Sequence, residues 1–144
     1  MNEIRVGFHT LVEAYETVHR AEEITVGMRA VLEFVDREGP RTVPDIARSR
    51  RVSRQHIQTL ANPLEERGLV EFVENPAHRR SPLVALTVPG ANLIARMRAR
   101  EAEFLKSIRL RSSSRDFETA TEILRSFRED LIAGIRDQHA REGD

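Results

Sequence analysis

The sequence predicts a mainly α-helical fold of the α+β class, in which two short helices and a β-hairpin lie between longer helices. Apolar residues recur at helical spacing towards both ends of the chain, within 3–20 and 91–135. Between these ends lie short segments bounded by glycine and proline, and two β-prone runs. A length of 144 residues suits one domain with an attached dimerisation element.

The composition excludes several classes of protein. The chain has no cysteine, which rules out disulfides and thiolate metal sites. It has no N-terminal signal pattern and no apolar run approaching about 18 residues, the length that a membrane span needs. We therefore expect a cytoplasmic protein that does not associate with a membrane.

Charge is unevenly distributed along the chain, although the net charge is zero. Residues 1–40 carry −4, residues 41–80 carry +3 and residues 81–144 carry +1. A codon bias towards arginine explains most of the 22 arginines, so their clustering between 41 and 59 is more informative than their number. The forked donors of arginine suit phosphate and guanine.

Two helices are predicted before residue 40. The first spans 3–20, and the second follows Thr25, a good N-cap, and ends at Gly39-Pro40. The first helix carries an apolar stripe of Ile4, Phe8, Leu11, Val12, Tyr15 and Val18. The side chains expected to face inward from the second are Met28, Val31, Leu32 and Val35.

Two short helices joined by a tight turn follow, which is typical of a helix-turn-helix. Pro44 fits the first position of the first helix, and Ser53 can cap the second, predicted at 53–67. Pro63 predicts a kink that leaves the first turns, 53–62, intact. The inward side chains of the two helices are Ile46, Ala47, Ile57, Leu60, Ala61 and Leu64.

A β-hairpin directly after a helix-turn-helix forms a wing. The β-prone runs 69–74 and 83–88 predict such a wing over 69–88, with a loop at 75–82. The fold class is therefore a winged helix-turn-helix, with N- and C-terminal helices that form a dimerisation region.

The remaining chain predicts two long helices, the first beginning after Gly90 and the two separated by a break at 111–115. In the last helix, apolar residues alternate at spacings of three and four, which makes a narrow seam for another helix: Phe117, Ala120, Leu124, Phe127 and Leu131. The predicted organisation is an N-terminal dimerisation helix, the winged helix-turn-helix and C-terminal dimerisation helices, at 1–24, 25–90 and 91–144.

The predicted second short helix exposes many hydrogen-bonding side chains and no acid in its first two turns. Such a face can read base edges, and the nearby arginines can hold phosphates. A solvated helix face is the alternative, but the preceding helix, the arginine cluster and the hairpin favour double-stranded DNA. The candidate base-reading residues are Arg54, Gln55, His56 and Gln58. The candidate phosphate contacts are Ser53, Thr59, Arg41, Arg48 and Arg51.

The wing tip carries Arg79 and Arg80. A wing beside a recognition helix lies near the adjacent minor groove, whose negative potential attracts arginine. We therefore expect both arginines to contact DNA, with a solvated pair at a loop tip as the alternative.

The order of these elements resembles the MarR family of winged-helix transcription regulators over nearly the whole chain. The family commonly shows Asp-Pro-x-Asp-Arg-Arg and then Leu-Thr-x-x-Gly in the wing. Here 75–80 reads Asn-Pro-Ala-His-Arg-Arg, and 86–90 reads Leu-Thr-Val-Pro-Gly. By this resemblance Arg80 aligns with the arginine that enters the minor groove. His78 stands where the family has the acid that orients this arginine, which puts the tip salt bridge in doubt.

The resemblance also implies a homodimer formed by the N-terminal helix and the last two helices. The apolar stripes at 4–18 and 117–135 agree with this independently. It further implies a pocket for a small aromatic or anionic effector, with candidate lining residues Phe8, His9, Val12, Tyr15, Met28 and Leu32. The plainer interpretation, which we favour from sequence alone, is that these six are core and dimer contacts.

No spacing of histidines or acids matches a metal site, and the chain has no phosphate-binding glycine loop and no nucleophile elbow. We therefore expect no enzyme, metal or cofactor. The predicted function is a homodimeric, sequence-specific transcription regulator, a repressor, on a pseudo-palindromic operator, released by an effector. The alternative is a protein-interaction module that dimerises without DNA, although such a surface would expose more apolar area.

Overall fold

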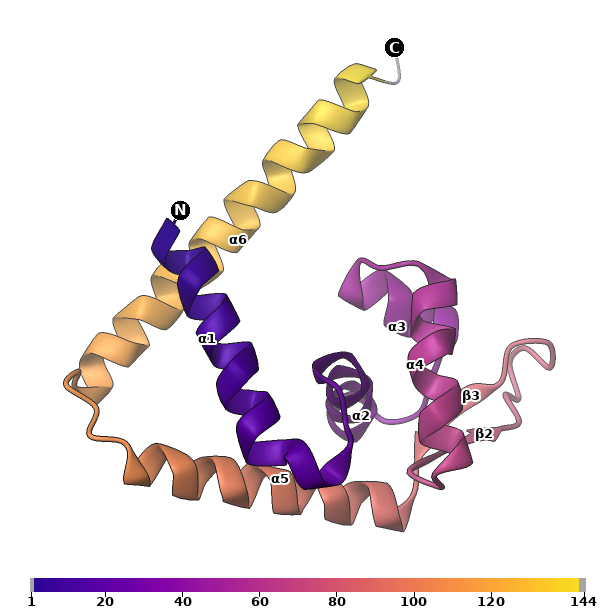
Figure 1. Cartoon of the computed structure of the whole chain (residues 1–144). Coiled ribbons are helices and arrows are strands. Elements are labelled where there is room, and N and C mark those ends of the chain that lie inside the picture. The colour runs from indigo at the N-terminus through magenta and orange to yellow at the C-terminus, as the bar shows by residue number, and fades with distance from the viewer. Residues whose placement is uncertain (1, 143–144) are drawn as a thin grey trace. The chain divides into compact units, whose positions relative to one another are not determined.

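The computed structural model describes residues 2–142 and confirms the mainly α-helical class with a small antiparallel sheet. Figure 1 shows the elements in chain order. They are α1 (Asn2–His19), the 3-10 helix η1 (Arg20–Glu22), α2 (Val26–Glu38), β1 (Arg41–Thr42), α3 (Val43–Arg50), α4 (Arg54–Glu66), β2 (Val70–Val73), β3 (Leu83–Leu86), α5 (Val88–Ser107) and α6 (Ser114–Glu142).

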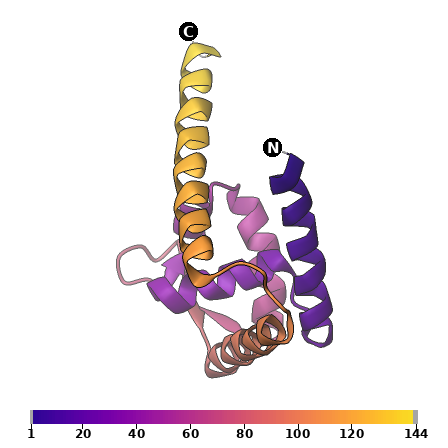
Figure 2. The ribbon, with the colours of Figure 1, turned by 90° about the vertical axis from the view of Figure 1, so that its left-hand side faces the viewer.

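The chain divides into two compact units, one ending at Ser107 and the other beginning at Ile108. The second unit contains α6, a single helix of 29 residues (Figure 2). Its exposed apolar side chains include Phe117, Ile123, Leu124, Leu131 and Ile135. In this division α5 lies in the same compact unit as the winged helix-turn-helix, and the predicted domain boundaries after residues 24 and 90 stay a prediction.

Threonine side chains cap the N-termini of α2 and α3. Thr25 Oγ1 accepts the Met28 N–H at 3.1 Å, as predicted. Thr42 caps α3, which begins at Val43, so Pro44 lies at the second helical position and not at the first as predicted. The Thr42 hydroxyl donates to Asp45 Oδ2 at 2.6 Å, and this bond lowers the pKa of the Asp45 carboxyl, with a smaller contribution from Arg48.

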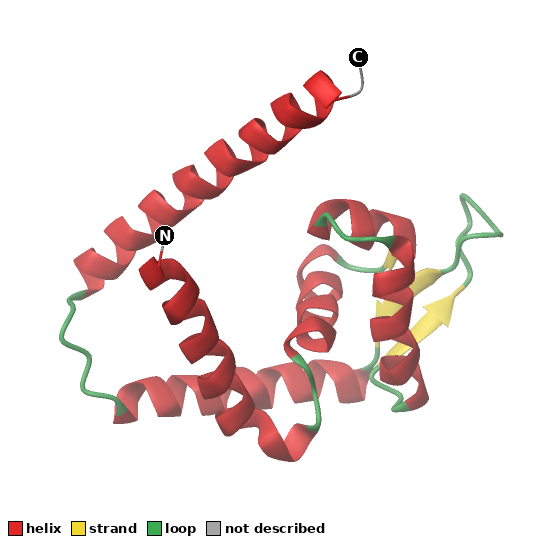
Figure 3. Ribbon diagram, turned by 45° about the horizontal axis from the view of Figure 1, so that its top comes forward, coloured by secondary structure: helices red, strands yellow, loops and turns green. Residues whose placement is uncertain are grey.

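The sheet has three antiparallel strands in the order β1-β3-β2. The predicted hairpin is present, with Val73 opposite Leu83 at the base of the loop. Figure 3 shows this loop extending beyond the ends of β2 and β3. The short strand β1 was not predicted, because two residues cannot show a period of two. Its pairing sets Arg41 opposite Val84 at the edge of the sheet.

The wing joins α5 earlier than predicted, since α5 begins at Val88 and not after Gly90. Thr87 explains the early start: its Oγ1 donates to the Gly68 carbonyl at 2.7 Å and accepts the Gly90 N–H at 3.1 Å. Gly90 is buried, and a Cβ at this position would overlap the Leu69 carbonyl oxygen. The base of the wing and the first turn of α5 are therefore in direct backbone contact.

One hydrophobic core joins the elements of the first unit. Its side chains come from α2, α3, α4, the sheet and α5, and the helix faces match the predicted apolar periodicity. The most deeply buried apolar members are Val31, Leu32, Ile46, Ile57, Leu64, Val70, Val84 and Met97. Burying large aliphatic side chains contributes roughly 1.5–3 kcal/mol each, so this core holds α4 and the wing in place.

A buried polar cluster connects α1 to α2 and α5. His19 is almost fully buried, and its Nε2 lies 2.8 Å from Glu101 Oε1. The Glu101 carboxylate is shared with Arg29, whose Nη2 donates to Oε2 at 2.7 Å. Among the described residues, His19 Nδ1 has no hydrogen-bond partner and lies 4.0 Å from Glu22 Oε2. Burial lowers the pKa of His19, and the charges of Arg29 and Arg100 lower it further.

This lowered pKa predicts a pH-dependent stability. Above about pH 6.5, the ordinary histidine pKa, His19 is neutral in the folded and in the unfolded chain. Its contribution to the free energy of unfolding is then fully present. As the pH falls below that value the unfolded chain takes up the proton first, so the free energy of unfolding decreases. Between pH 7.5 and pH 5, the free energy of unfolding measured with urea should fall more for wild type than for His19→Gln. The glutamine keeps a donor for Glu101 but does not titrate. Equal losses would contradict this account.

Candidate nucleic-acid interface

The recognition helix α4 has one buried face and one open face. Ser53 Oγ accepts the His56 N–H at 3.0 Å and caps the helix as predicted. The side chains of Ile57, Ala61 and Leu64 are buried in the core. Since residues three and four apart share a helix face, this burial directs the intervening polar side chains towards solvent.

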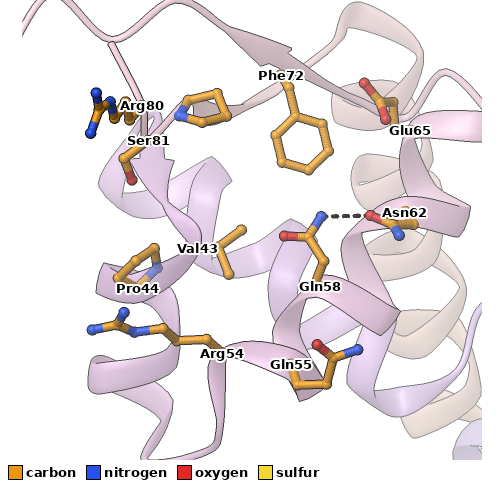
Figure 4. A pocket seen from close by; sticks show the side chains of 11 residues that line it. Val43, Pro44, Arg54, Gln55, Gln58, Asn62, Glu65, Phe72, Arg80 and Ser81 are labelled. Carbon is orange, nitrogen blue, oxygen red and sulfur yellow. Dashed lines mark hydrogen bonds between the residues drawn. The ribbon is translucent and has the colours of Figure 1, made fainter. Parts of the chain in front are cut away.

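A groove lies along the open face of α4, with a volume of about 530 Å³. Figure 4 shows side chains from α4 and from the wing arranged around this one opening. Its lining comes from the start of α3, from α4, from β2 and from the wing loop: Val43, Pro44, Arg54, Gln55, Gln58, Asn62, Glu65, Phe72, Arg80, Ser81 and Pro82.

Four of the eleven predicted DNA-contacting residues meet in this groove: Arg54, Gln55, Gln58 and Arg80. Of the pair at the wing tip, it is Arg80 that lines the groove, whereas Arg79 lies with its Nε 3.9 Å from Glu74 Oε1. The guanidinium groups of Arg54 and Arg80 approach the groove from different elements, 26 residues apart in sequence.

The other seven predicted residues are exposed but do not line the groove. Some are engaged within the protein: Thr59 Oγ1 donates to the His56 carbonyl at 2.7 Å, and Arg48 Nη1 to Asp45 Oδ1 at 3.0 Å. Arg41 Nη1 donates to the neighbouring Pro40 carbonyl at 2.9 Å. Arg51 has a left-handed backbone at the turn between α3 and α4, with a φ of 56°.

Three polar residues that line the groove were not predicted from the sequence: Asn62, Glu65 and Ser81. Asn62 lies one helical turn after Gln58, whose Nε2 donates to Asn62 Oδ1 at 2.6 Å. The periodicity of α4 could have found Asn62 and Glu65, since 58, 62 and 65 share one helix face. Glu65 lies beyond the kink predicted at Pro63, yet α4 continues through Pro63 to Glu66.

The wing tip is organised by Asn75, which is 7% exposed. Its Nδ2 donates to the Ser81 carbonyl at 2.9 Å, and its Oδ1 accepts the Ala77 N–H at 3.1 Å. Two backbone hydrogen bonds form turns within the loop. The His78 N–H donates to the Asn75 carbonyl, and the Ser81 N–H donates to the His78 carbonyl. These bonds close the loop across its base, so a neutral amide holds the tip although His78 stands where an acid is usual.

A second cavity, of about 350 Å³, lies between α1, α2 and the end of α3. Three predicted effector-pocket residues line it, Phe8, Val12 and Tyr15. Of the other three, Met28 and Leu32 are buried in the core and His9 is exposed; none of them lines this cavity. Its remaining lining residues are Leu11, Val26, Arg29, Ala30, Glu33 and Arg50.

Tyr15 is one of the polar residues that line this cavity. Burial raises the pKa of its phenol, which therefore stays neutral, and the hydroxyl donates to the Ile24 carbonyl at 3.1 Å. The Arg29 guanidinium lies 5.4 Å from the centre of the Tyr15 ring. The cavity thus combines an aromatic wall with Arg29, Arg50 and Glu33, whose carboxylate accepts a hydrogen bond from Arg29 Nε at 2.9 Å.

The described part of the chain has no metal-binding cluster and no membrane-spanning helix. Within residues 2–142, no group of three or more His, Asp or Glu side chains could hold a metal ion. Over the same residues, no helix has the length and hydropathy needed to cross a membrane.

The helix-turn-helix and its flanking hairpin define a winged helix-turn-helix protein, and comparisons with known proteins agree. Residues 29–81 match the sequence model of the MarR family. An uncharacterized protein of Mycobacterium tuberculosis is 47% identical over 53 residues, a match that covers 37% of this chain and only 37% of that protein.

Solved structures extend the likeness to most of the chain. A MarR family transcription regulator is 28% identical with a TM-score of 0.79, over 91% of this chain and 89% of its own. The regulator BpsR of Bordetella bronchiseptica, whose DNA binding is regulated by 6-hydroxynicotinic acid, has a TM-score of 0.76 at 19% identity, over 88% and 90%. The fold of this chain, together with the match over residues 29–81, is similar to that of MarR family transcription regulators.

The amide of Asn75 gives a test of how the wing tip is held. Asn75→Ala removes both side-chain bonds across the loop, so the Ala77 N–H loses its acceptor and should exchange with solvent faster. Asn75→Asp keeps the acceptor for Ala77 but sets a carboxylate against the Ser81 carbonyl, so exchange at Ala77 should rise less. Hydrogen exchange measured by NMR reports both effects. Unchanged exchange in Asn75→Ala would show that the backbone turns alone hold the tip.

Proposed function

We propose that this protein is a sequence-specific double-stranded DNA-binding transcription regulator that acts as a homodimer, and that it represses transcription. The observation that carries the proposal is the shared groove, where Arg54, Gln55 and Gln58 of α4 meet Arg80 of the wing. Arginine and glutamine pair with guanine and adenine edges in the major groove. An arginine on a wing suits the narrower minor groove.

Each group of residues has a role in this proposal. Arg54, Gln55, His56 and Gln58 contact bases, whereas Ser53, Thr59, Arg41, Arg48 and Arg51 contact phosphates. Arg80 enters the minor groove, and Arg79 meets phosphate beside it. The absence of acids from the first turn of α4, within the structure described, favours phosphate at that helix end.

Exposed apolar side chains support the homodimer. On α1, Ile4, Val6, Phe8 and Leu11 are each about half exposed or more, and α6 carries the seam described above. Apolar area of this kind is typical of a surface that a partner covers. A two-fold dimer on DNA sets half-sites roughly 34–36 Å apart, and therefore predicts a pseudo-palindromic operator.

Two substitutions test the DNA-binding roles separately. Gln55→Ala should change the preference at one base pair, costing about 1–3 kcal/mol on the preferred site. Arg80→Ala should weaken binding to all sites and reduce the slope of log affinity against log salt by about 1. Gel shifts at several salt concentrations, on fragments selected from a randomised duplex pool, measure both effects.

The matched control for Arg80→Ala is Arg96→Ala, an exposed arginine on α5 that does not line the groove. It should leave the salt slope unchanged. If Arg80→Ala binds as well as wild type at every salt concentration, the wing role is wrong. If wild type shows no salt-sensitive shift at all, the alternative of a protein-interaction module that dimerises without DNA is favoured.

The second cavity supports regulation by a small effector. BpsR has this fold and responds to an aromatic acid, and the cavity here joins Tyr15 to Arg29 and Arg50. We therefore include in the proposal that an anionic aromatic molecule binds against Arg50 and releases the protein from DNA.

Calorimetry with 6-hydroxynicotinate and benzoate tests this part of the proposal. Arg50→Ala should raise the Kd of a binding acid about tenfold, the usual size of a lost charged hydrogen bond. The neutral analogue benzamide should bind weakly to wild type and to Arg50→Ala alike. An absence of heat with both acids, together with unchanged DNA affinity in their presence, would rule out this class of effector.

A further inference from the structure

The groove contains one hydrogen bond between side chains of the recognition helix itself. Gln58 Nε2 donates to Asn62 Oδ1 at 2.6 Å, and both residues line the groove. Figure 4 shows this bond as a dashed line, with the Gln58 amide oxygen directed away from Asn62. Gln58 is half-buried and Asn62 is exposed. The bond joins residues four apart, the spacing at which helix side chains meet.

A glutamine amide presents an acceptor oxygen on one side and two N–H donors on the other. Its terminal torsion is broad and roughly two-fold, so an unrestrained amide exposes either side to a ligand. The bond to Asn62 uses one N–H of Gln58 and thereby defines which side its nitrogen occupies. Its oxygen and its second N–H remain available in the groove.

This restraint matters for reading a base. Adenine is recognised in the major groove by a donor and an acceptor together, at N7 and the N6 amino group. An amide with a defined orientation offers its donor and acceptor in one order only. A rotating amide accommodates other bases at the same position, which weakens discrimination.

Nothing in the packing requires asparagine at position 62. The side chain is exposed, and asparagine is a weaker helix former than alanine or leucine. The Asn62 Oδ1 accepts a hydrogen bond from Gln58, a residue of the proposed base-reading face.

We propose that Asn62 is a positioning residue that fixes the amide of Gln58 and so sets the base preference at the one base pair that Gln58 reads. This inference rests on the proposed DNA-binding function. Asn62 acts through Gln58, and the base contact belongs to Gln58.

The test uses the full chain and a randomised pool of duplex DNA. Sites selected by wild type are resynthesised with all four base pairs at each position, and each is competed against the preferred site. Gln58→Ala identifies the position that Gln58 reads, where wild type should discriminate about tenfold or more. Asn62→Leu should then reduce the affinity ratio between the preferred and the other base pairs at that position about fivefold. This is a large part of the discrimination that one such contact provides.

Further variants separate positioning from a structural role. Asn62→Asp keeps an acceptor oxygen for Gln58, so it should retain the wild-type base preference even if its charge weakens overall affinity. In Gln58→Ala the substitution Asn62→Leu should add nothing, because there is no amide to position. The matched control Asn92→Leu removes an exposed asparagine from α5, outside the groove, and should leave every preference unchanged.

Two results would overturn the inference. Asn62→Leu could leave discrimination unchanged at the position that Gln58→Ala alters. It could also alter a different position, which would mean that Asn62 reads a base itself. Failure of the proposed function looks different, because wild type would then select no sequence from the pool.

Discussion

Burial of one face of α4 is the interaction on which the rest of the structure depends. Ile57, Ala61 and Leu64 pack into the core formed by α2, the sheet and α5. Their burial fixes the rotation of the helix about its own axis, and a rotation by one residue, about 100°, would turn the polar side chains out of the groove. The groove is therefore a consequence of core packing, and hydrophobic free energy maintains its polar geometry.

Most of the fold could be predicted from sequence because the long helices have a clear period. The apolar stripe of α2 and the buried face of α4 follow the helical spacing, and the hairpin follows from two β-prone runs. The strand β1 could not be found, since two residues carry no periodic signal. The start of α5 was placed late, because the hydroxyl of Thr87 caps this helix through bonds that reach back to Gly68.

The candidate groove was predictable only in part. The residues on α4 follow from helix geometry, whereas their meeting with Arg80 depends on how the wing folds back beside the helix. Glu65 was not expected because it lies beyond the kink predicted at Pro63, and Ser81 lines the groove only because the wing loop lies beside α4. His78, in place of the usual acid, put the salt bridge of the wing tip in doubt, but the amide of Asn75 forms hydrogen bonds across the loop, and Asn75 lies in the same sequence motif.

A second set of contacts ties the N-terminal helix to the end of the recognition helix. Arg67, at the end of α4, donates to the carbonyls of Glu22 and Glu23, just beyond α1. Arg100 of α5 pairs with the Glu22 side chain. Under the proposed regulation, an effector beside α1 would bias α4 by no more than its difference in affinity between two arrangements of the protein.

Gly90 illustrates how close packing and local preference oppose each other within one residue. Alanine would favour the helix by about 1 kcal/mol over glycine. Overpacking a filled site costs typically 1–3 kcal/mol, and here the obstacle is the backbone carbonyl of Leu69, which cannot rotate away like a side chain. Substitution of Gly90 by an ordinary helix former is therefore unfavourable. The close spacing between the wing and α5 depends on the absence of a Cβ atom at position 90.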